Sequence, residues 1–279
     1  MSRGLGDVYK RQDLVIELVD ARIPLSSRNP DIDQLGANKA RLILLNKADL
    51  ADERQTAKWQ QYFEKQGCFV VALNARNRNS MKAINGVVAE ACKEKIERDR
   101  KRGILNRPVR AMVVGIPNVG KSTFINSFAG KACAKTGNKP GVTKGKQWIR
   151  LSKTLELLDT PGILWPKFED QQVGLNLALI GSMNDEILNI EEMAVSLIQY
   201  LKDVYPLLLT KRYDLSDEAE ESCKNEQDAY EVLAQIARNR KCVLKGDEPD
   251  IRKAAALLLD DFRSGRIGRI TLESPTEQA

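Results

Sequence analysis

The sequence predicts an α/β fold, in which a mostly parallel sheet with helices on both faces is followed by a small all-α domain. Four short apolar runs have the composition of buried parallel strands, and they span residues 14–19, 41–45, 69–73 and 111–114. A glycine-rich loop separates the last run from a helical pattern at 122–128. From residue 187 onward, apolar residues recur at three- and four-residue spacing, which is typical of amphipathic helices. The 279 residues are expected to form two domains, 13–183 and 184–279.

In chain order, the coherent pattern begins at residue 13, because residues 1–12 carry no helical or strand period. Residues 7–12 also resemble the translation of a sequencing-library adapter, so we expect 1–12 to be a non-native or disordered segment. Two further strands are expected at 147–151 and 155–158. The other expected helices span 52–66, 80–100, 187–205, 230–243 and 251–262.

Charge is unevenly distributed along the chain, although the formal net charge is only +6. Residues 186–279 hold 13 Lys and Arg against 19 Asp and Glu, so this part carries a net charge of −6. The first 185 residues hold the other 31 basic and 19 acidic residues, a net charge of +12. Such a basic half predicts a polyanionic partner, with nucleic acid as the first candidate and a solvated basic face as the alternative.

The five cysteines are scattered without a C-x-x-C pair, and the sequence has no histidine, so no zinc site is expected. Cysteines of this kind are typical of reduced thiols in a cytosolic protein. No apolar run approaches the roughly 18 residues of a membrane span, and no signal-peptide pattern opens the chain. We therefore expect no membrane partner.

The strongest chemical signal is a G-x-x-x-x-G-K-S pattern that runs from Gly115 to Ser122, between an apolar run and a helical one. A strand that turns through glycines into a helix directs several backbone N–H groups and the positive end of the helix dipole at one point, where an anion binds. In such loops the lysine, here Lys121, reaches the β and γ phosphates, and the next hydroxyl, here Ser122, is a magnesium ligand. The other expected nucleotide-binding residues of this loop are Asn118, Val119, Gly120 and Thr123.

Two segments that follow other strands predict recognition of guanine. Asn46-Lys47-Ala48-Asp49 is an N-K-x-D segment directly after the run at 41–45. The Asp49 carboxylate can accept hydrogen bonds from N1–H and the exocyclic amine of guanine, and a site of this kind can reject adenine by roughly 10⁴-fold. Asn74-Ala75 resembles the S-A-K segment behind the guanine ring in GTPases, with asparagine in place of serine. These residues predict binding of GTP and GDP.

Two segments after the phosphate loop match the switch regions of GTPases. Thr143 lies in a lysine- and glycine-rich stretch at 131–146, and its hydroxyl is expected to complete the Mg²⁺ shell when the γ phosphate is present. Asp159 to Gly162 closes an apolar strand as a D-x-x-G segment, in which Asp159 holds Mg²⁺ and the Gly162 N–H senses the γ phosphate. The expected catalytic residues are Lys121, Thr143 and Gly162, and the expected Mg²⁺ ligands are Ser122, Thr143 and Asp159.

The order of these segments is rotated relative to Ras-like GTPases, in which the phosphate loop comes first and the base-recognition segments come last. Two damaged domains in tandem are one explanation, and one circularly permuted domain is the other. No second phosphate loop precedes Gly115 and no second N-K-x-D follows Gly162, so the sequence predicts a circularly permuted P-loop GTPase domain. The chain then leaves this domain just after switch II, and a movement of switch II on hydrolysis is expected to pull on the C-terminal domain.

With these motifs, the chain resembles the bacterial ribosome biogenesis GTPase A (YlqF) family from residue 13 to about residue 272. The resemblance rests on the motifs above and on further matches at Asp20–Pro30, Pro140–Gly145, Ile163 and Asp261–Gly265. It implies a cytoplasmic, ribosome-associated GTPase for late assembly of the large (50S) subunit, with ribosomal proteins as partners and a C-terminal helical domain that contacts rRNA. No DNA partner is expected, and off the ribosome we expect a monomer. The W-F-P-G-H-M-like segment that opens the family is absent from this sequence.

One departure from Ras-like GTPases bears on the reaction. A glutamine after D-x-x-G orients the attacking water in those proteins, but Ile163 stands at this position here. Slow intrinsic hydrolysis and stimulation by the ribosome are therefore expected. Similar proteins with an apolar residue at this position use a K⁺ ion bound by a phosphate-loop asparagine, which Asn118 matches. Such an ion would supply the charge that an arginine finger gives elsewhere.

Three functions stay open from the sequence. In the first, GTP favours docking on an immature large subunit and hydrolysis releases the protein. In the second, GTP gates RNA binding and hydrolysis is incidental, and in the third a permuted GTPase serves the small or the mitochondrial ribosomal subunit. Two basic clusters favour RNA binding by the C-terminal domain over packing against the G domain, and they contain Arg238, Arg240, Lys241, Lys245, Arg263, Arg266 and Arg269.

Overall fold

The computed structural model describes residues 12–104, 107–134, 147–151, 154–162, 164, 170–216 and 223–275. The chain divides into two compact units, here termed the sheet unit (1–168 and 273–279) and the helical unit (169–272). The sequence analysis places this division after residue 183 and gives all later residues to the second domain. The division falls earlier because helix α7 packs against helix α8, and the end of the chain returns to the sheet unit.

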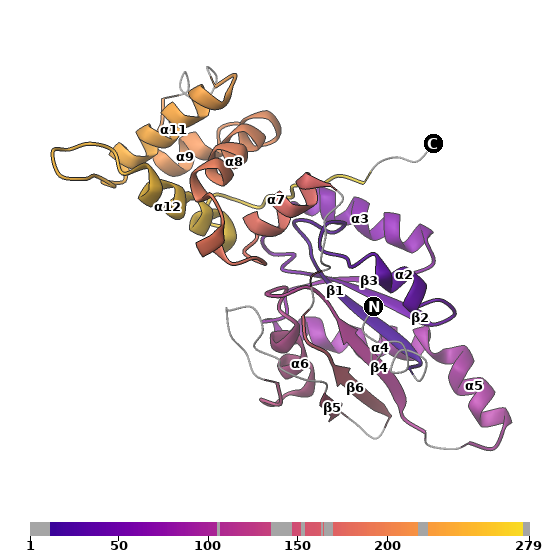
Figure 1. Ribbon diagram of the computed structural model, residues 1–279. Helices are drawn as coiled ribbons and strands as arrows, with labels where there is room; N and C mark the ends of the chain where they lie inside the picture. The colour runs from indigo at the N-terminus through magenta and orange to yellow at the C-terminus, as the bar shows by residue number, and fades with distance from the viewer. Residues whose placement is uncertain are drawn as a thin grey trace. The chain divides into compact units, whose positions relative to one another are not determined.

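The sheet unit contains six strands in the order β3-β2-β1-β4-β6-β5 (Figure 1). The strands are β1 (Leu14–Asp20), β2 (Ala40–Asn46), β3 (Phe69–Leu73), β4 (Val109–Val114), β5 (Gln147–Arg150) and β6 (Leu155–Asp159). Among these strands, every neighbouring pair is parallel except β5 and β6. The mostly parallel sheet predicted from the apolar runs is therefore confirmed.

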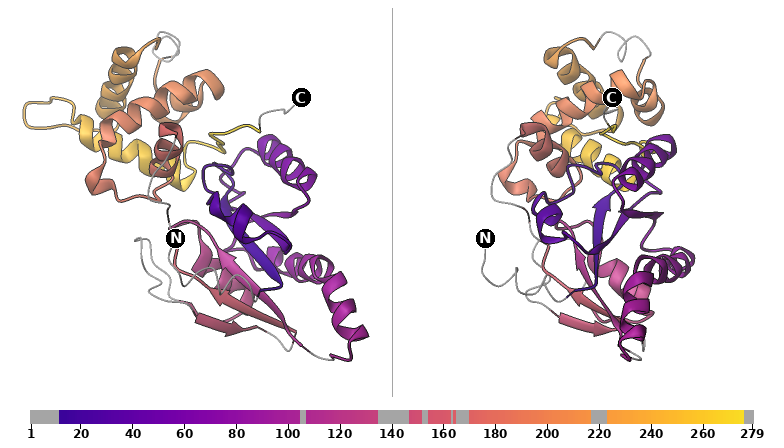
Figure 2. Two further views of the ribbon diagram at one scale, coloured as in Figure 1. Left: turned by 45° about the vertical axis from the view of Figure 1, so that its right-hand side comes forward. Right: turned by 90° about the vertical axis from the view of Figure 1, so that its right-hand side faces the viewer.

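Helices cover both faces of this twisted sheet (Figure 2). They are α2 (Asp31–Leu35), α3 (Glu53–Lys65), α4 (Arg78–Ala91), α5 (Lys93–Lys101) and α6 (Lys121–Ala129). Successive residues of a strand point to opposite faces, and all seven residues of β1 are buried, so this central strand contributes to both layers. On one face, Trp59 and Phe63 of α3 pack with Ile43 and Leu45 of β2. On the other face, α4 contacts β2, β3 and α6.

The single helix that the sequence predicts over 80–100 is two helices, α4 and α5, with a break at Cys92. The buried stripe of α4 consists of Met81, Ile84 and Val88 and ends at Cys92. Helix α5 has no buried residue. The helix consists mostly of charged residues, and no buried apolar side chain fixes its direction in line with α4.

The helical unit is built around α8, against which α11 and α12 pack. Its described helices are α7 (Gln171–Leu179), η1 (Asp185–Ile187), α8 (Ile190–Val204), α9 (Leu208–Tyr213), α11 (Glu226–Asn239) and α12 (Ile251–Ser264). Side-chain oxygens of Asn189, Asn225 and Asp250 accept backbone N–H bonds at the starts of the three long helices. Apolar spacing predicts these three helices but misses the shorter ones, which have too few turns to show a period. In the described ranges, no helix combines the length and apolar character needed to cross a bilayer.

Leu44 of β2 offers a direct test of the sheet core, because its side chain is completely buried. Leu44→Ala is expected to lower the free energy of unfolding by about 2–5 kcal/mol through lost apolar burial and a residual cavity. Urea unfolding followed by circular dichroism measures this change. Ile104→Ala, at a side chain of the same unit that is 42% exposed, should change it by about 0.5 kcal/mol or less. Equal losses in both variants would contradict the placement of Leu44 in the core.

Candidate nucleotide-binding site

The segments predicted to bind a nucleotide all lie where parallel strands end. Asn46 ends β2 and Asp159 ends β6, while Asn74 and Gly115 directly follow β3 and β4. The carboxyl ends of parallel strands share one edge of a sheet, and α/β proteins bind ligands at this edge. The strand order places β2 and β6 on either side of β1 and β4. The base-recognition and phosphate segments therefore reach one edge, although they are far apart in the sequence.

Asn46 joins three of these segments through its side-chain amide. The amide Nδ2 donates to the Val119 carbonyl at 2.7 Å, and Oδ1 accepts from the Ala75 N–H at 2.9 Å. Asn46 is buried. A side chain at Gly120 would collide with this amide, because a Cβ there would lie 2.4 Å from Nδ2 and the φ of Gly120 is +97°. Glycine is required at this position both for its conformation and for this close approach.

The phosphate loop has the geometry of an anion site. Asn118 and Gly120 both have positive φ, of 58° and 97°, and α6 begins directly after them at Lys121. Ser122 and Thr123 form the first turn of this helix and are half-buried. The backbone N–H groups at the start of an α-helix have no partner inside the helix and attract anions. The geometry of the loop suits the phosphate cradle that the sequence predicts.

Two buried ionisable groups of opposite sign, Lys121 and Asp159, belong to the phosphate-loop and D-x-x-G segments. Burial lowers the pKa of Lys121 to about 8, although the negative charge of Asp159 opposes the shift. Burial also raises the pKa of Asp159, against the effect of Lys121 and of a backbone hydrogen bond at Thr160. Within the described residues, Oδ1 of Asp159 is buried and makes no hydrogen bond. A buried carboxylate oxygen without a donor fits a cation ligand.

A divalent cation at Asp159 would need ligands of more than one kind. Among the described residues, no three His, Cys, Asp or Glu side chains gather into a metal-binding cluster. Mg²⁺ commonly takes one or two carboxylates and completes its shell with water and substrate phosphates. Asp159, the hydroxyl of Ser122 and a nucleotide phosphate fit that requirement. Mg²⁺ held there would neutralise phosphate charge.

The D-x-x-G segment runs directly beside the phosphate loop. Thr160 is buried and its hydroxyl donates to the Val113 carbonyl at 2.8 Å. A Cβ at Gly162 would lie 3.0 Å from the Pro117 nitrogen, so glycine allows this close approach of the two backbones. The predicted residues Thr143 and Ile163 lie outside the described residues.

The lysine of the N-K-x-D segment is held by a residue to which the sequence analysis assigns no role, although it lies in the Asp20–Pro30 match. Nζ of Lys47 lies 2.9 Å from Oδ2 of Asp20, the last residue of β1. Arg22 binds the same carboxylate through Nε and Nη2, both at 2.9 Å. Burial alone would raise the pKa of Asp20, but the charges and hydrogen bonds of Arg22 and Lys47 hold this pKa well below its usual range. Burial lowers the pKa of Lys47, against the charge of Asp20.

The other residues of the N-K-x-D and Asn74 segments, which the sequence predicts to recognise the base, lie at the same edge of the sheet. The Ala48 N–H donates to the Leu73 carbonyl at 3.1 Å, and Oδ1 of Asn74 accepts from the Arg76 N–H at 2.9 Å. Asp49 is exposed, so its carboxylate is accessible to a ligand. The sequence offers one signal for Asp20, which is the D-A-R segment at the end of the first apolar run. Strands β1 and β2 pair with Asp20 opposite Asn46, so Asp20 lies next to the N-K-x-D segment.

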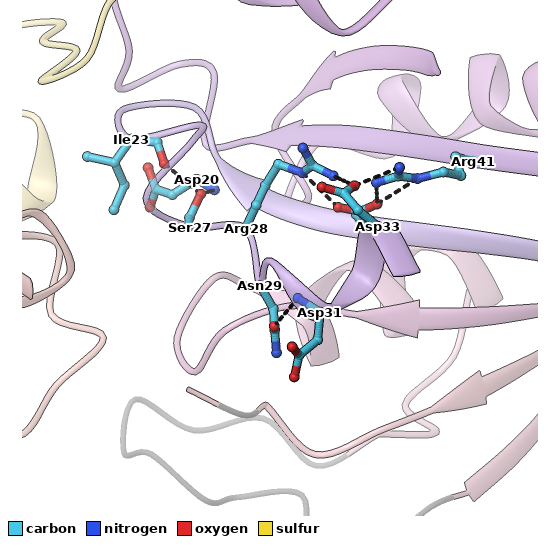
Figure 3. A network of polar contacts seen from close by, with 9 residues as sticks. Asp20, Ile23, Ser27, Arg28, Asn29, Asp31, Asp33 and Arg41 are labelled. Carbon is cyan, nitrogen blue, oxygen red and sulfur yellow. Dashed lines mark hydrogen bonds and ion pairs between the residues drawn. The ribbon is translucent and has the colours of Figure 1, made fainter. Parts of the chain in front are cut away.

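The loop that follows Asp20 is fixed by a polar network (Figure 3). Ser27 Oγ accepts from the Asp20 N–H at 3.0 Å and donates to the Ile23 carbonyl at 2.7 Å. Arg28 forms ion pairs at 2.9 Å with the buried Glu17 and at 2.8 Å with Asp33. These contacts tie the loop to its neighbouring elements, and the bond from Ser27 supports Asp20 directly.

Comparison with known proteins decides the family. The 50S ribosome-binding GTPase family matches residues 110–242. Ribosome biogenesis GTPase A of Bacillus cereus is 46% identical over 275 residues, which are 99% of this chain and 90% of that protein. The chain belongs to the ribosome biogenesis GTPase A family.

More distant members agree with this conclusion. Ribosome biogenesis GTPase A of Thermotoga maritima is 31% identical over 99% of this chain and 91% of that protein. A GDP-bound structure of YlqF is 27% identical with a TM-score of 0.68, and the match covers 99% of this chain and 100% of that one. A GNP-bound structure of YlqF from T. maritima has a TM-score of 0.64 at 28% identity over 97% of this chain and 96% of that one. The protein is thus a circularly permuted GTPase, as the order of its motifs predicts.

The lowered pKa of Lys121 predicts a proton-linked step in nucleotide binding. Bound phosphates favour the ammonium form, so binding raises a pKa that is about 8 in the free protein. GDP binding should therefore take up protons above that pH, and by about pH 8.5 the affinity should fall by about three- to fivefold relative to pH 7. Calorimetry in two buffers with different ionisation enthalpies measures the uptake. Equal heats in both buffers at the higher pH would contradict the shift.

Proposed function

We propose that this GTPase is an assembly factor for the large (50S) ribosomal subunit, which binds rRNA in the GTP state and leaves when GTP is hydrolysed. The observation that carries the proposal is the convergence of the base and phosphate segments on Asn46, in a chain that aligns over 99% of its length with a protein named ribosome biogenesis GTPase A. The net charge of +12 over the first 185 residues also suits a polyanionic partner.

In this proposal, the site residues take the roles that their motifs predict. Lys121 and the N–H groups of the loop bind the β and γ phosphates. Ser122, Thr143 and Asp159 hold Mg²⁺, and Gly162 senses the γ phosphate. Asn118 holds K⁺, which offsets the lack of a glutamine at Ile163. The base side is formed by Asn46, Lys47, Ala48, Asp49, Asn74 and Ala75.

Several basic residues of the helical unit make contacts within that unit, which leaves fewer of them to bind rRNA. Arg263 pairs with Asp185 and donates to the Leu179 carbonyl at 2.9 Å. Arg266 pairs with the buried Asp261, and Arg240 donates to the Arg212 carbonyl. These cations stabilise the unit itself and are less available for phosphates. The exposed cations around the end of α11 are better candidates, and they are Arg238, Lys241 and Lys245.

Asp49→Asn tests the assignment of the base side. The amide keeps one acceptor but replaces the other with a donor, so it no longer matches N1–H and the amine of guanine. Xanthine carries a carbonyl in place of that amine and can accept the new donor. We expect GDP affinity to fall by about 10²-fold or more and XDP affinity to rise. Competitive titration of a fluorescent GDP measures both. Unchanged preference for GDP would contradict the assignment.

GTP turnover tests the proposed reaction and its partner. We expect turnover to be at least about tenfold faster in KCl than in NaCl of equal ionic strength, because K⁺ stabilises charge that develops on the phosphates. Asn118→Ala should remove the difference. Immature or mature large subunits should raise turnover further, and small subunits should not. Binding to large subunits that requires GTP but leaves turnover unchanged would instead support GTP-gated binding with incidental hydrolysis.

A further inference from the structure

The last described residues of the chain lie on the sheet unit, directly after the helical unit ends at Leu272. The Glu273 carboxylate accepts hydrogen bonds from the Leu25 N–H at 2.7 Å and the Ser26 N–H at 3.0 Å, and from the Ser26 hydroxyl. The Trp59 indole N–H donates to the Glu273 carbonyl at 3.1 Å. Ser274 Oγ donates to the Gln55 side chain at 3.2 Å. The chain end is thus anchored through both backbone and side chain.

Glu273 binds the loop that follows Asp20, and Asp20 is the residue that pairs with Lys47. Ser26 and Ser27 are both buried. Ser27 Oγ accepts from the Asp20 N–H at 3.0 Å, and the Asp20 carboxylate lies 2.9 Å from Nζ of Lys47. Each contact in this series is a hydrogen bond or ion pair between neighbouring groups. The carboxylate of Glu273 is therefore linked to the lysine of the N-K-x-D segment by three polar contacts and one step along the chain, from Ser26 to Ser27.

We propose that Glu273 is a positioning residue for the guanine site, which acts through the loop at 20–27 to hold Asp20 and Lys47. This inference rests on the base-side assignment under the proposed function. A carboxylate that accepts two adjacent N–H groups and a hydroxyl forms strong, charge-assisted hydrogen bonds. Without it, the N–H of the buried Ser26 loses this acceptor, and the loop relaxes toward arrangements that hydrate its N–H groups.

The coupling acts in both directions. If docking of Glu273 favours the loop arrangement that binds guanine, bound guanine nucleotide favours docking of Glu273 by the same factor. Other polar contacts of the loop, such as the ion pair of Arg28 with Glu17, do not involve Glu273, so loss of Glu273 weakens the base side without removing the loop. The effect should therefore fall on recognition of guanine more than on binding of phosphates.

Glu273→Gln in the full chain tests the proposal. We expect the affinity for GDP to fall by about five- to thirtyfold, and the preference for GDP over IDP to shrink by about threefold or more, because IDP lacks the amine that the base side recognises. Glu231→Gln removes the same charge at an exposed site of the helical unit and should change neither value. Trp59→Phe removes the indole N–H but keeps an aromatic ring, and it should lower the GDP preference in the same direction.

Two further readouts separate positioning from a loss of stability. Hydrogen exchange should show that the Leu25 and Ser26 amides exchange faster in Glu273→Gln, and that GDP slows this exchange in the unmodified protein. A lowered melting temperature with unchanged affinity and GDP preference would overturn the proposal. If Asp49→Asn also fails to alter base preference, the base-side assignment itself is wrong. If Asp49→Asn alters it and neither Glu273→Gln nor Trp59→Phe does, only the role of Glu273 is wrong.

Discussion

The nucleotide site depends on one buried amide, that of Asn46. An amide has both a donor and an acceptor, so the same side chain can satisfy the Val119 carbonyl and the Ala75 N–H. Its burial makes both bonds costly to lose, because each partner would then stay unpaired away from water. The β2 end, the phosphate loop and the segment after β3 are separate in the sequence, and this side chain fixes their spacing.

The base side and the phosphate side of the proposed site differ in how their buried charges are compensated. On the base side, Asp20 is matched by the two cations Arg22 and Lys47, at 2.9 Å each. On the phosphate side, Lys121 and Asp159 are buried with pKa values shifted toward their neutral forms. Among the described residues, one oxygen of Asp159 has no donor. The charges of Asp20, Arg22 and Lys47 therefore compensate one another within the protein, whereas phosphates and Mg²⁺ would stabilise charges that burial disfavours at Lys121 and Asp159.

Circular permutation gives the chain an unusual path. The helical unit begins after residue 168, shortly beyond the D-x-x-G segment, and its last residue, Leu272, is followed by Glu273 on the sheet unit. In sequence, one connection therefore follows the D-x-x-G segment, and the other precedes the residue that contacts Leu25 and Ser26.

Much of this protein was predictable from local sequence. Apolar runs and their period predict the strands and the long helices, because burial requires apolar residues at fixed spacing. The phosphate loop, N-K-x-D and D-x-x-G predict the chemistry, because each is a short continuous segment whose backbone and side chains act together. The single occurrence of each motif, in rotated order, predicts a permuted GTPase, and membership of the family confirms it.

Only the tertiary structure decided how distant residues combine. Asp20 pairs with Lys47, and Asn46 bonds to two other segments. Glu273 binds Leu25 and Ser26. These contacts join residues that are up to 248 positions apart. It also decided that Arg240, Arg263 and Arg266 serve internal contacts. Spacing along a chain carries no information about such pairs, since a side chain's partners and its burial depend on how whole elements pack.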